Sequence, residues 1–213
     1  MTSPERPKTR DTRLVERKKR ARMIARTLRA LFPSAGIALR YSTHFELLTA
    51  VILSAQCTDK KVNEVTERLF KKYRTLREYT EADKETFSVD IKETGFCRAK
   101  AKHILITAHI IDTQFNGKVP NTMETLLTLP GVARKTANVV LGNAFGIIEG
   151  IAVDTHVKRF AQKFDLADSN DPVHIEQNLM AALPKKDWFF ITYGFIEYGR
   201  QICTARMHDC RKH

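Results

Sequence analysis

The chain has 213 residues, which is enough for one substantial domain or two small ones. Hydrophobic residues make up 43% and charged residues 28%, a globular balance that excludes global disorder. The formal net charge of +12 favours a polyanionic partner, because basic side chains placed on phosphates release counterions. No stretch approaches the roughly 20 apolar residues that span a bilayer, which excludes a membrane-spanning protein.

The cysteines and the N-terminal composition indicate a reducing, cytoplasmic compartment. Four cysteines, at positions 57, 97, 203 and 210, are too few and too scattered for a disulfide scaffold. We expect Cys57 and Cys97 to be buried apolar residues. The N-terminus is charged throughout and lacks the apolar segment of a secretory signal.

The N-terminal region predicts a short tail and then a basic helix. Residues 1–12 are polar, contain two prolines, and are expected to be disordered. From Arg13 onward, apolar side chains recur at helical spacing on one side, at Ile24, Leu28, Leu31 and Phe32. The dense basic run from Arg17 to Arg22 is typical of a solvated helix face, and a DNA-facing arm is the second interpretation.

The rest of the chain predicts one helix after another, because no segment alternates apolar and polar residues with a period of two. The expected boundaries are a capping box at Thr43 and Glu46, an N-cap at Asp59, stops at Gly95 and Asn116-Gly117, and a cap at Asp171 before Pro172. The predicted fold class is all-α.

Residues 122–145 predict two short helices joined by a tight hairpin at Pro130-Gly131. The second helix is expected to begin near Arg134, where free backbone N–H groups and the helix dipole favour a phosphate. An ordinary helical hairpin that packs its apolar residues is an equally good interpretation of this segment alone.

Two residues suggest chemistry. A lysine at a helix N-terminus, such as Lys135, has its charge disfavoured by the dipole, and partial burial would disfavour it further. A neutral amine is a nucleophile that forms Schiff bases, whereas a surface lysine paired to phosphate is the common alternative. Asp154 is expected to cap the next helix, and its second oxygen remains available for a site shared with Lys135. Linear spacing leaves open whether the two meet.

The segment LPGVARKTA at 129–137 resembles the helix-hairpin-helix of the endonuclease III family of DNA glycosylases. The resemblance covers about residues 40–206 in the same order, including LSAQCTD at 53–59 and VDTHVKR at 153–159. The combination is highly specific, although each piece alone is weak.

This resemblance implies two helical domains. A six-helix barrel would occupy 37–148 and carry the hairpin, and residues 13–36 with 149–213 would form the second domain. DNA would lie in a cleft that Lys135 and Asp154 reach from opposite domains. The implied partner is damaged double-stranded DNA, and no membrane is involved. The protein would act as a monomer in the cytoplasm, associated with the nucleoid.

The resemblance also implies a bifunctional glycosylase/AP lyase. The enzyme would flip an oxidised or ring-saturated pyrimidine out of the stack, Lys135 would displace the base, and Asp154 would assist. β-Elimination through the Lys135 Schiff base would then nick the strand. Gln56 would fill the gap in the duplex, and Phe96 would be an apolar wedge, unless it is a core residue. The full set of expected DNA-binding residues is Gln56, Phe96, Gly131, Ala133, Arg134, Thr136, His156 and Arg206.

Two departures from the family pattern matter. Ala133 stands where a second hairpin glycine is usual, and it is acceptable if its φ is negative. The family often ends in four cysteines that hold a [4Fe–4S] cluster, whereas only Cys203 and Cys210 match here and His213 stands at the third position. We expect neither an intact cluster nor a bound metal, and catalysis needs none.

Other functions remain open. A non-catalytic helix-hairpin-helix module would bind DNA without releasing a base, and a monofunctional mismatch glycosylase would release a base without forming an imine. A pyrimidine-dimer glycosylase would differ only in the shape of its pocket. A membrane-surface protein is the weakest option, because the basic helix lacks a strong apolar face.

Overall fold

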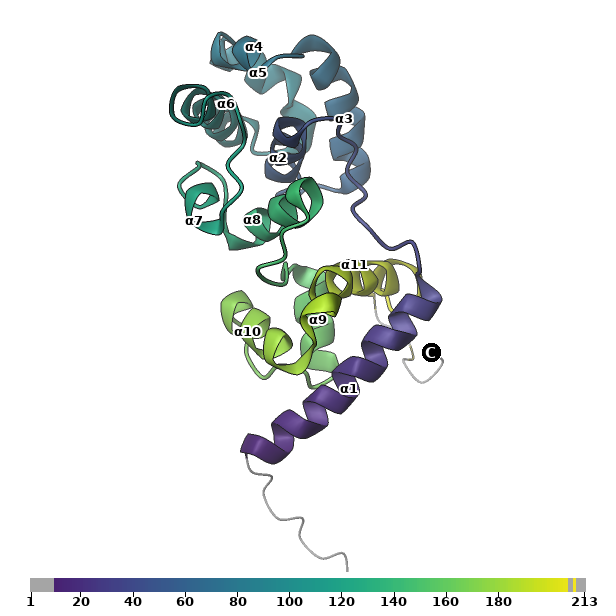
Figure 1. Cartoon of the computed structure of the whole chain (residues 1–213). Coiled ribbons are helices and arrows are strands. Elements are labelled where there is room, and N and C mark those ends of the chain that lie inside the picture. Colours follow the sequence, from purple (N-terminus) through teal and green to yellow (C-terminus); the bar gives the residue numbers. More distant parts are fainter. Residues whose placement is uncertain (1–9, 207–208, 210–213) are drawn as a thin grey trace, which may run out of the picture. The chain divides into compact units, whose positions relative to one another are not determined.

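The computed structural model describes residues 10–206 and Asp209, and this part of the chain is helical and contains no strand (Figure 1). The prediction of an all-α fold is therefore confirmed. The chain divides into two compact units, which we call the inner unit (Ile37–Glu149) and the terminal unit (Met1–Gly36 with Gly150–His213). Among the described residues, no helix combines the length and the apolar character that a membrane crossing requires.

The inner unit is built around helix α2, His44–Leu53. Residues Leu47–Leu53 are all buried, because a helix that is apolar on every side is stable only when others surround it. Helices α3, α6 and α8 pack against α2, and α6 packs against α4 and α5. The other elements are α3 (Asp59–Lys72), α4 (Leu76–Thr80), α5 (Lys84–Asp90), the 3-10 turn η1 (Lys92–Thr94), α6 (Cys97–Gln114), α7 (Met123–Leu126), α8 (Arg134–Val140) and the π turn η2 (Leu141–Phe145).

Helix starts in the inner unit follow the capping signals closely. The capping box is confirmed, since the Thr43 side chain accepts from the Glu46 N–H and the Glu46 carboxylate accepts from the Thr43 N–H. The predicted N-cap at Asp59 is wrong by one residue, because the Thr58 hydroxyl accepts from the Lys61 N–H. Asp59 instead lies in the first turn of α3, where its negative charge suits the helix dipole.

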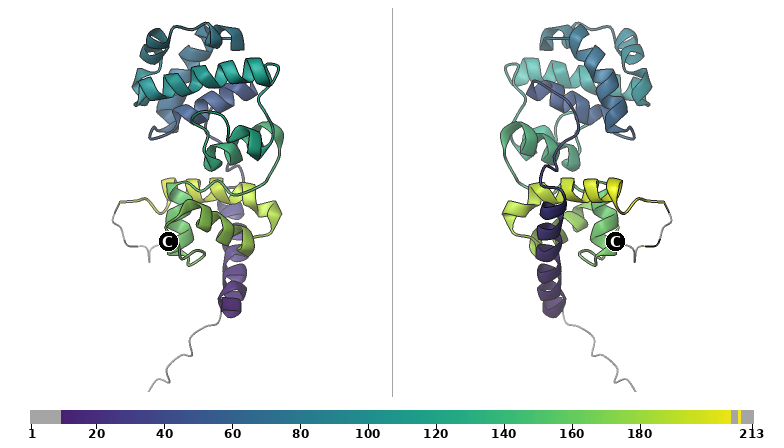
Figure 2. Two further views of the ribbon diagram at one scale, coloured as in Figure 1. Left: turned by 90° about the vertical axis from the view of Figure 1, so that its left-hand side faces the viewer. Right: turned by 90° about the vertical axis from the view of Figure 1, so that its right-hand side faces the viewer.

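The terminal unit contains α1 (Arg10–Leu31), α9 (Thr155–Lys163), α10 (Pro172–Ala182) and α11 (Lys185–Gln201). The long helix α1 packs against α10 and α11 (Figure 2). It begins at Arg10, so the predicted tail is wrong for residues 10–12, where Asp11 favours the positive end of the helix. Residues 1–9 lie outside the described residues. Leu31, expected on the apolar face, is half exposed, whereas Leu28 is buried.

Two arginines in the basic run of α1 form ion pairs within the terminal unit. Arg17 is 9% exposed, and its guanidinium lies 3.2 Å from carboxylate oxygens of both Asp165 and Asp168. Arg20 lies 2.8 Å from Asp165. For Arg17 and Arg20, neither a solvated face nor a DNA-facing arm is correct, because both side chains attach α1 to the segment after α9.

These pairs predict a loss of stability in acid. The hydrogen bond from Arg20, aided by Arg17, lowers the pKa of Asp165 below its ordinary value. Because the pKa of Asp165 is lower in the folded than in the unfolded state, its ionised carboxylate stabilises the fold at pH values above the unfolded pKa. This stabilisation is lost as the pH falls below about 4 and the carboxylate takes up a proton. Thermal unfolding between pH 5 and pH 2.5 should therefore depend less on pH in Asp165→Asn than in the wild type. Because the carboxylate is 65% exposed, the difference should be about 1 kcal/mol or less.

The matched control for this prediction is Asp112→Asn. Asp112 is an exposed aspartate of α6 with no ion pair among the described residues. It should keep the wild-type dependence on pH. Equal curves for Asp165→Asn and the wild type would contradict a stabilising role of the Arg20–Asp165 pair.

Candidate active site

The predicted hairpin lies between α7 and α8 in the inner unit. Its turn is closed by a hydrogen bond from the Val132 N–H to the Leu129 carbonyl, 3.1 Å. Leu129 and Val132 are both buried, so apolar packing anchors the two sides of the turn. Gly131 has φ +79°, a conformation that glycine adopts without strain. The hairpin is thus a rigid connection with a glycine at its exposed tip.

Helix α6 supports the turn from beneath through two residues that the sequence reasoning missed. The Thr107 hydroxyl donates to the Pro130 carbonyl, 3.1 Å. A Cβ atom at Gly131 would lie 3.0 Å from His103 Nδ1 and 3.1 Å from His103 Cβ. His103 and Thr107 are four residues apart and so share one face of α6. The sequence shows this spacing, but no nearby residue indicates that this face of α6 contacts the hairpin.

Gly131→Ala is expected to destabilise the hairpin. The left-handed conformation costs a residue with a Cβ about 1–2 kcal/mol, and the clash with His103 adds to it. We expect a lower free energy of unfolding in urea. The added variant His103→Ala should recover only part of the clash contribution, because its own Cβ remains, and none of the backbone contribution. Gly36→Ala is the control, since a Cβ there meets only the Ser34 carbonyl at 3.9 Å. Full recovery in the double variant would mean that backbone strain is negligible.

The first turn of α8 carries three of the predicted site residues. Its N-cap is Ala133, whose φ of −93° is negative, so the methyl group fits without strain as the sequence analysis required. An alanine side chain cannot cap, and the first-turn N–H groups receive no side-chain acceptor from it. Arg134 and Thr136 are half-buried, whereas Lys135 is exposed.

Asp154 is the N-cap of α9, as predicted. Its Oδ1 accepts from the Val157 N–H, 2.7 Å, and the residue is half-buried. The Oδ2 atom makes no hydrogen bond within the described part of the chain, so this oxygen remains available for another interaction. Asp154 belongs to the terminal unit and Lys135 to the inner unit.

His156, a predicted DNA contact, is half-buried against the backbone of α11. A Cβ at Gly199 would lie 2.2 Å from His156 Nδ1 and 2.9 Å from the Arg159 guanidinium, so only glycine fits there. Arg159 donates to the Cys203 carbonyl, 2.7 Å. His156 therefore has a packing role that its position in the VDTHVKR segment did not indicate.

The two residues expected to enter the duplex both have unusual backbone geometry. Gln56 has φ +54° and Phe96 has φ +49°, although neither is a glycine. Gln56 is exposed, and Phe96 is 66% exposed. The alternative of a core phenylalanine at 96 is thus wrong. Cys57 and Cys97, which follow these two residues, are half-buried rather than buried as expected.

The C-terminal cysteine motif is only partly described. Cys203 is 2% exposed within the apolar core of the terminal unit, and its Sγ accepts from Lys163 Nζ, 3.3 Å. Arg206 is exposed, and Cys210 and His213 lie outside the described residues. Among the described residues, no group of three or more metal-ligating side chains occurs. Cys203 therefore lies in the core of the terminal unit beside Lys163.

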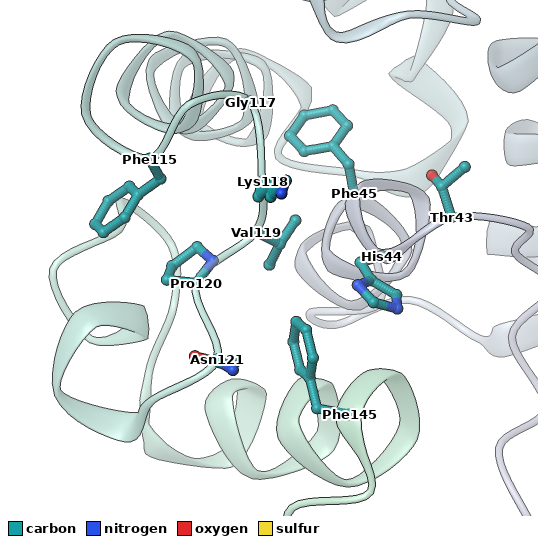
Figure 3. Close-up of a pocket in the computed structure, with 10 residues that line it drawn as sticks. All are labelled: Thr43, His44, Phe45, Phe115, Gly117, Lys118, Val119, Pro120, Asn121 and Phe145. Carbon is teal, nitrogen blue, oxygen red and sulfur yellow. The ribbon is translucent and has the colours of Figure 1, made fainter.

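A hollow in the inner unit contains none of the predicted residues. It lies between the start of α2, the connection Gly117–Asn121 and Phe145 (Figure 3). The rings of His44 and Phe145 meet edge to face with centroids 4.5 Å apart. Neither Lys135 nor Asp154 lines this hollow, so we do not assign the chemistry to it.

The similarity of the chain to known proteins shows its family. The profile of the HhH-GPD superfamily of base excision DNA repair proteins matches residues 49–185. The chain is 46% identical over 198 residues to endonuclease III of Synechocystis sp. (strain ATCC 27184 / PCC 6803 / Kazusa), covering 93% of this chain and 90% of that protein. It is 43% identical to endonuclease III of Bacillus subtilis (strain 168), covering 84% and 82%. The chain belongs to the endonuclease III family. It is a base excision repair enzyme, a DNA glycosylase with AP lyase activity.

Solved structures agree with this assignment. A non-covalent endonuclease III–DNA complex superposes with a TM-score of 0.88 at 40% identity, covering 92% of both chains. A trapped endonuclease III–DNA covalent intermediate superposes with a TM-score of 0.87, also at 40% identity and 92% coverage of both. A thermostable thymine-DNA glycosylase, at 21% identity and a TM-score of 0.77, shares the fold. The family resemblance and the enzyme class predicted from the sequence are confirmed.

Proposed function

We propose that this endonuclease III family member removes oxidised or ring-saturated pyrimidines from duplex DNA and nicks the strand through a Schiff base on Lys135. One observation carries the proposal. An exposed lysine occupies the first turn of α8, directly after the hairpin, in a chain 40% identical to a protein trapped covalently on DNA. An exposed amine on a rigid turn is accessible to a sugar carbon, which a buried structural lysine is not.

The hairpin is proposed to hold the DNA backbone. A phosphate would bind the exposed main chain at Gly131 and the first-turn N–H groups of α8. Ala133 adds a methyl group beside this path, so binding should be modestly weaker than with glycine. Arg134 and Thr136 supply a charge and a hydroxyl on either side of Lys135, and His156 and Arg206 are proposed as further DNA contacts.

The proposed reaction proceeds through a covalent intermediate on Lys135. Lys135 Nζ attacks the sugar C1′, and the bond between C1′ and the damaged base breaks, so the base leaves with its electron pair and takes up a proton. Asp154 carboxylate stabilises the positive charge on the sugar or accepts the proton released by the amine. The bond between C1′ and the ring oxygen O4′ then breaks, O4′ takes up a proton, and the nitrogen of Lys135 forms the C=N bond of the imine. The imine acidifies the proton on the adjacent carbon, C2′. Loss of that proton expels the 3′ phosphate, and water then hydrolyses the imine to free Lys135.

The partners follow from this chemistry. The electrophile is activated as an imine, so no metal or cluster is needed for any step, and we propose that catalysis proceeds without one. The substrate is damaged double-stranded DNA, and the net charge of +12 suits its phosphate backbone. We further propose that one chain suffices for the reaction and that the protein works in the cytoplasm at the nucleoid.

Borohydride trapping tests the proposal. The protein is mixed with a duplex that carries one thymine glycol, reduced with sodium borohydride, digested, and mapped by mass spectrometry. We expect a reduced sugar adduct on Lys135 and a nick 3′ to the lesion. DNA binding without base release would indicate a non-catalytic module, and base release without an adduct would indicate a monofunctional glycosylase. Adducts on an abasic site or a pyrimidine dimer, but not on thymine glycol, would contradict the lesion class alone.

A further inference from the structure

Lys100 is a buried lysine of α6 that the proposed reaction does not use. Its residue surface is 4% exposed, and it lies entirely within the inner unit. Its ammonium donates to two main-chain carbonyls, at 2.8 Å to Leu53 and at 2.7 Å to Thr94. No carboxylate compensates its charge in any described ion pair. A buried ammonium without a carboxylate is costly, so its retention calls for a reason beyond packing.

The two carbonyls lie at the bases of the two segments expected to enter the duplex. Leu53 is the last residue of α2 and precedes Gln56 by three positions. Thr94 is the last residue of η1 and precedes Phe96 by two positions. These segments are far apart in the sequence, yet a carbonyl of each accepts a hydrogen bond from the same Lys100 nitrogen. Lys100 therefore connects the base of the Gln56 segment to the base of the Phe96 segment.

Both segments hold a strained residue outward. Gln56 and Phe96 have positive φ angles and exposed side chains, a combination that persists only when the surrounding structure enforces it. Burial lowers the pKa of the Lys100 ammonium, while Cys57 and Cys97, the neighbours of these two residues, act in the opposite direction. The electrostatic partners of Lys100 thus come from the same two segments as its hydrogen bonds.

We propose that Lys100 is a positioning residue that holds the Gln56 and Phe96 segments at a fixed separation, so that both side chains enter the duplex together when the damaged base is extruded. The inference rests on the proposed function. Lys100 touches neither the sugar nor the base, and it acts only through the two segments. Its effect should therefore be confined to substrates in which a base must be extruded from a paired duplex.

The test compares two substrates in Lys100→Met. One is a duplex with a single thymine glycol, and the other is a single-stranded oligonucleotide with a preformed abasic site, which needs no extrusion. We expect base excision from the duplex to fall between about 10-fold and 100-fold, because misplaced groups lose orientation. Borohydride trapping on the single strand should stay within about 2-fold of the wild type, since the imine chemistry is unchanged. Lys102→Met, which removes an exposed lysine two residues along the same helix, should leave both activities unchanged.

A variant set separates positioning from simple destabilisation. Lys100→Arg, which retains donors for both carbonyls, should excise better from the duplex than Lys100→Met. Adding Lys100→Met to the double variant Gln56→Ala, Phe96→Ala should lower duplex excision no further, because coupled residues are non-additive. An equal loss on both substrates, or full additivity, would overturn the proposal. If Lys100→Met does not fold, Lys100→Gln is judged by the same split.

The outcome for the wild type distinguishes a failure of the proposed function from a failure of the positioning role of Lys100. If the wild type forms no adduct on the thymine glycol duplex, the proposed function fails. If the wild type forms the adduct and Lys100→Met excises from the duplex at the wild-type rate, only the positioning role fails.

Discussion

Replacing Lys135 by glutamine is expected to abolish the borohydride adduct and to lower strand nicking by at least about a thousand-fold, because an amide cannot form an imine. Lys135 is exposed in the first turn of α8 and has no ion pair among the described residues, so the substitution should leave the fold intact. Gel analysis of a thymine glycol duplex measures the nick and the adduct, and urea unfolding measures stability. Activity should fall without a matching loss of stability.

Two further lysine variants control for charge. Lys135→Arg keeps a positive charge near the phosphates but stays protonated, so it should bind DNA and form no adduct. Lys118→Gln removes one exposed charge elsewhere in the inner unit and should retain nicking. A persistent adduct in Lys135→Gln would assign the nucleophile to another amine.

Asp154→Asn should separate catalysis from helix capping. Asparagine caps a helix as well as aspartate does, so its side-chain oxygen can still accept from the Val157 N–H. We expect base excision to fall by about 100-fold or more, which is the usual size of a lost acid–base or charge contribution. The free energy of unfolding should change by less than about 0.5 kcal/mol, because asparagine keeps the cap. Single-turnover base release and urea unfolding measure the two quantities.

Asp154→Ala completes the comparison. It removes the carboxylate and the cap together, so stability should also fall by about 1 kcal/mol. Trapping at a preformed abasic site should suffer less than base excision in both variants, because no base has to leave. If Asp154→Asn excised like the wild type, Asp154 would be only a helix cap.

Local signals made much of this protein predictable. The capping box at Thr43, the cap at Asp154 and the glycine tip of the hairpin each depend on residues within a few positions of one another. Capping and turn chemistry act over that distance, so the helices and the hairpin could be predicted in chain order. The errors were of one or a few residues, as at Asp59 and at Arg10, where neighbouring side chains compete for the same role.

Contacts between distant segments were beyond the reach of those signals. Nothing near Gly131 indicated that His103 lies beneath it, and nothing near Gly199 indicated His156. The basic run that contains Arg17 was interpreted as a solvated helix face, because its partner Asp165 is 148 positions away in the sequence.

The sequence by itself determined the all-helical class, the hairpin, the family and the two residues proposed to carry the reaction. Those features follow from residue type and short-range order, which a linear chain states directly. Only the tertiary structure decided that Lys135 is exposed, that Phe96 projects outward, and that Lys100 joins the bases of two distant segments. Burial and long-range hydrogen bonds arise when the whole core packs, and packing depends on which helix faces meet rather than on any one stretch of residues.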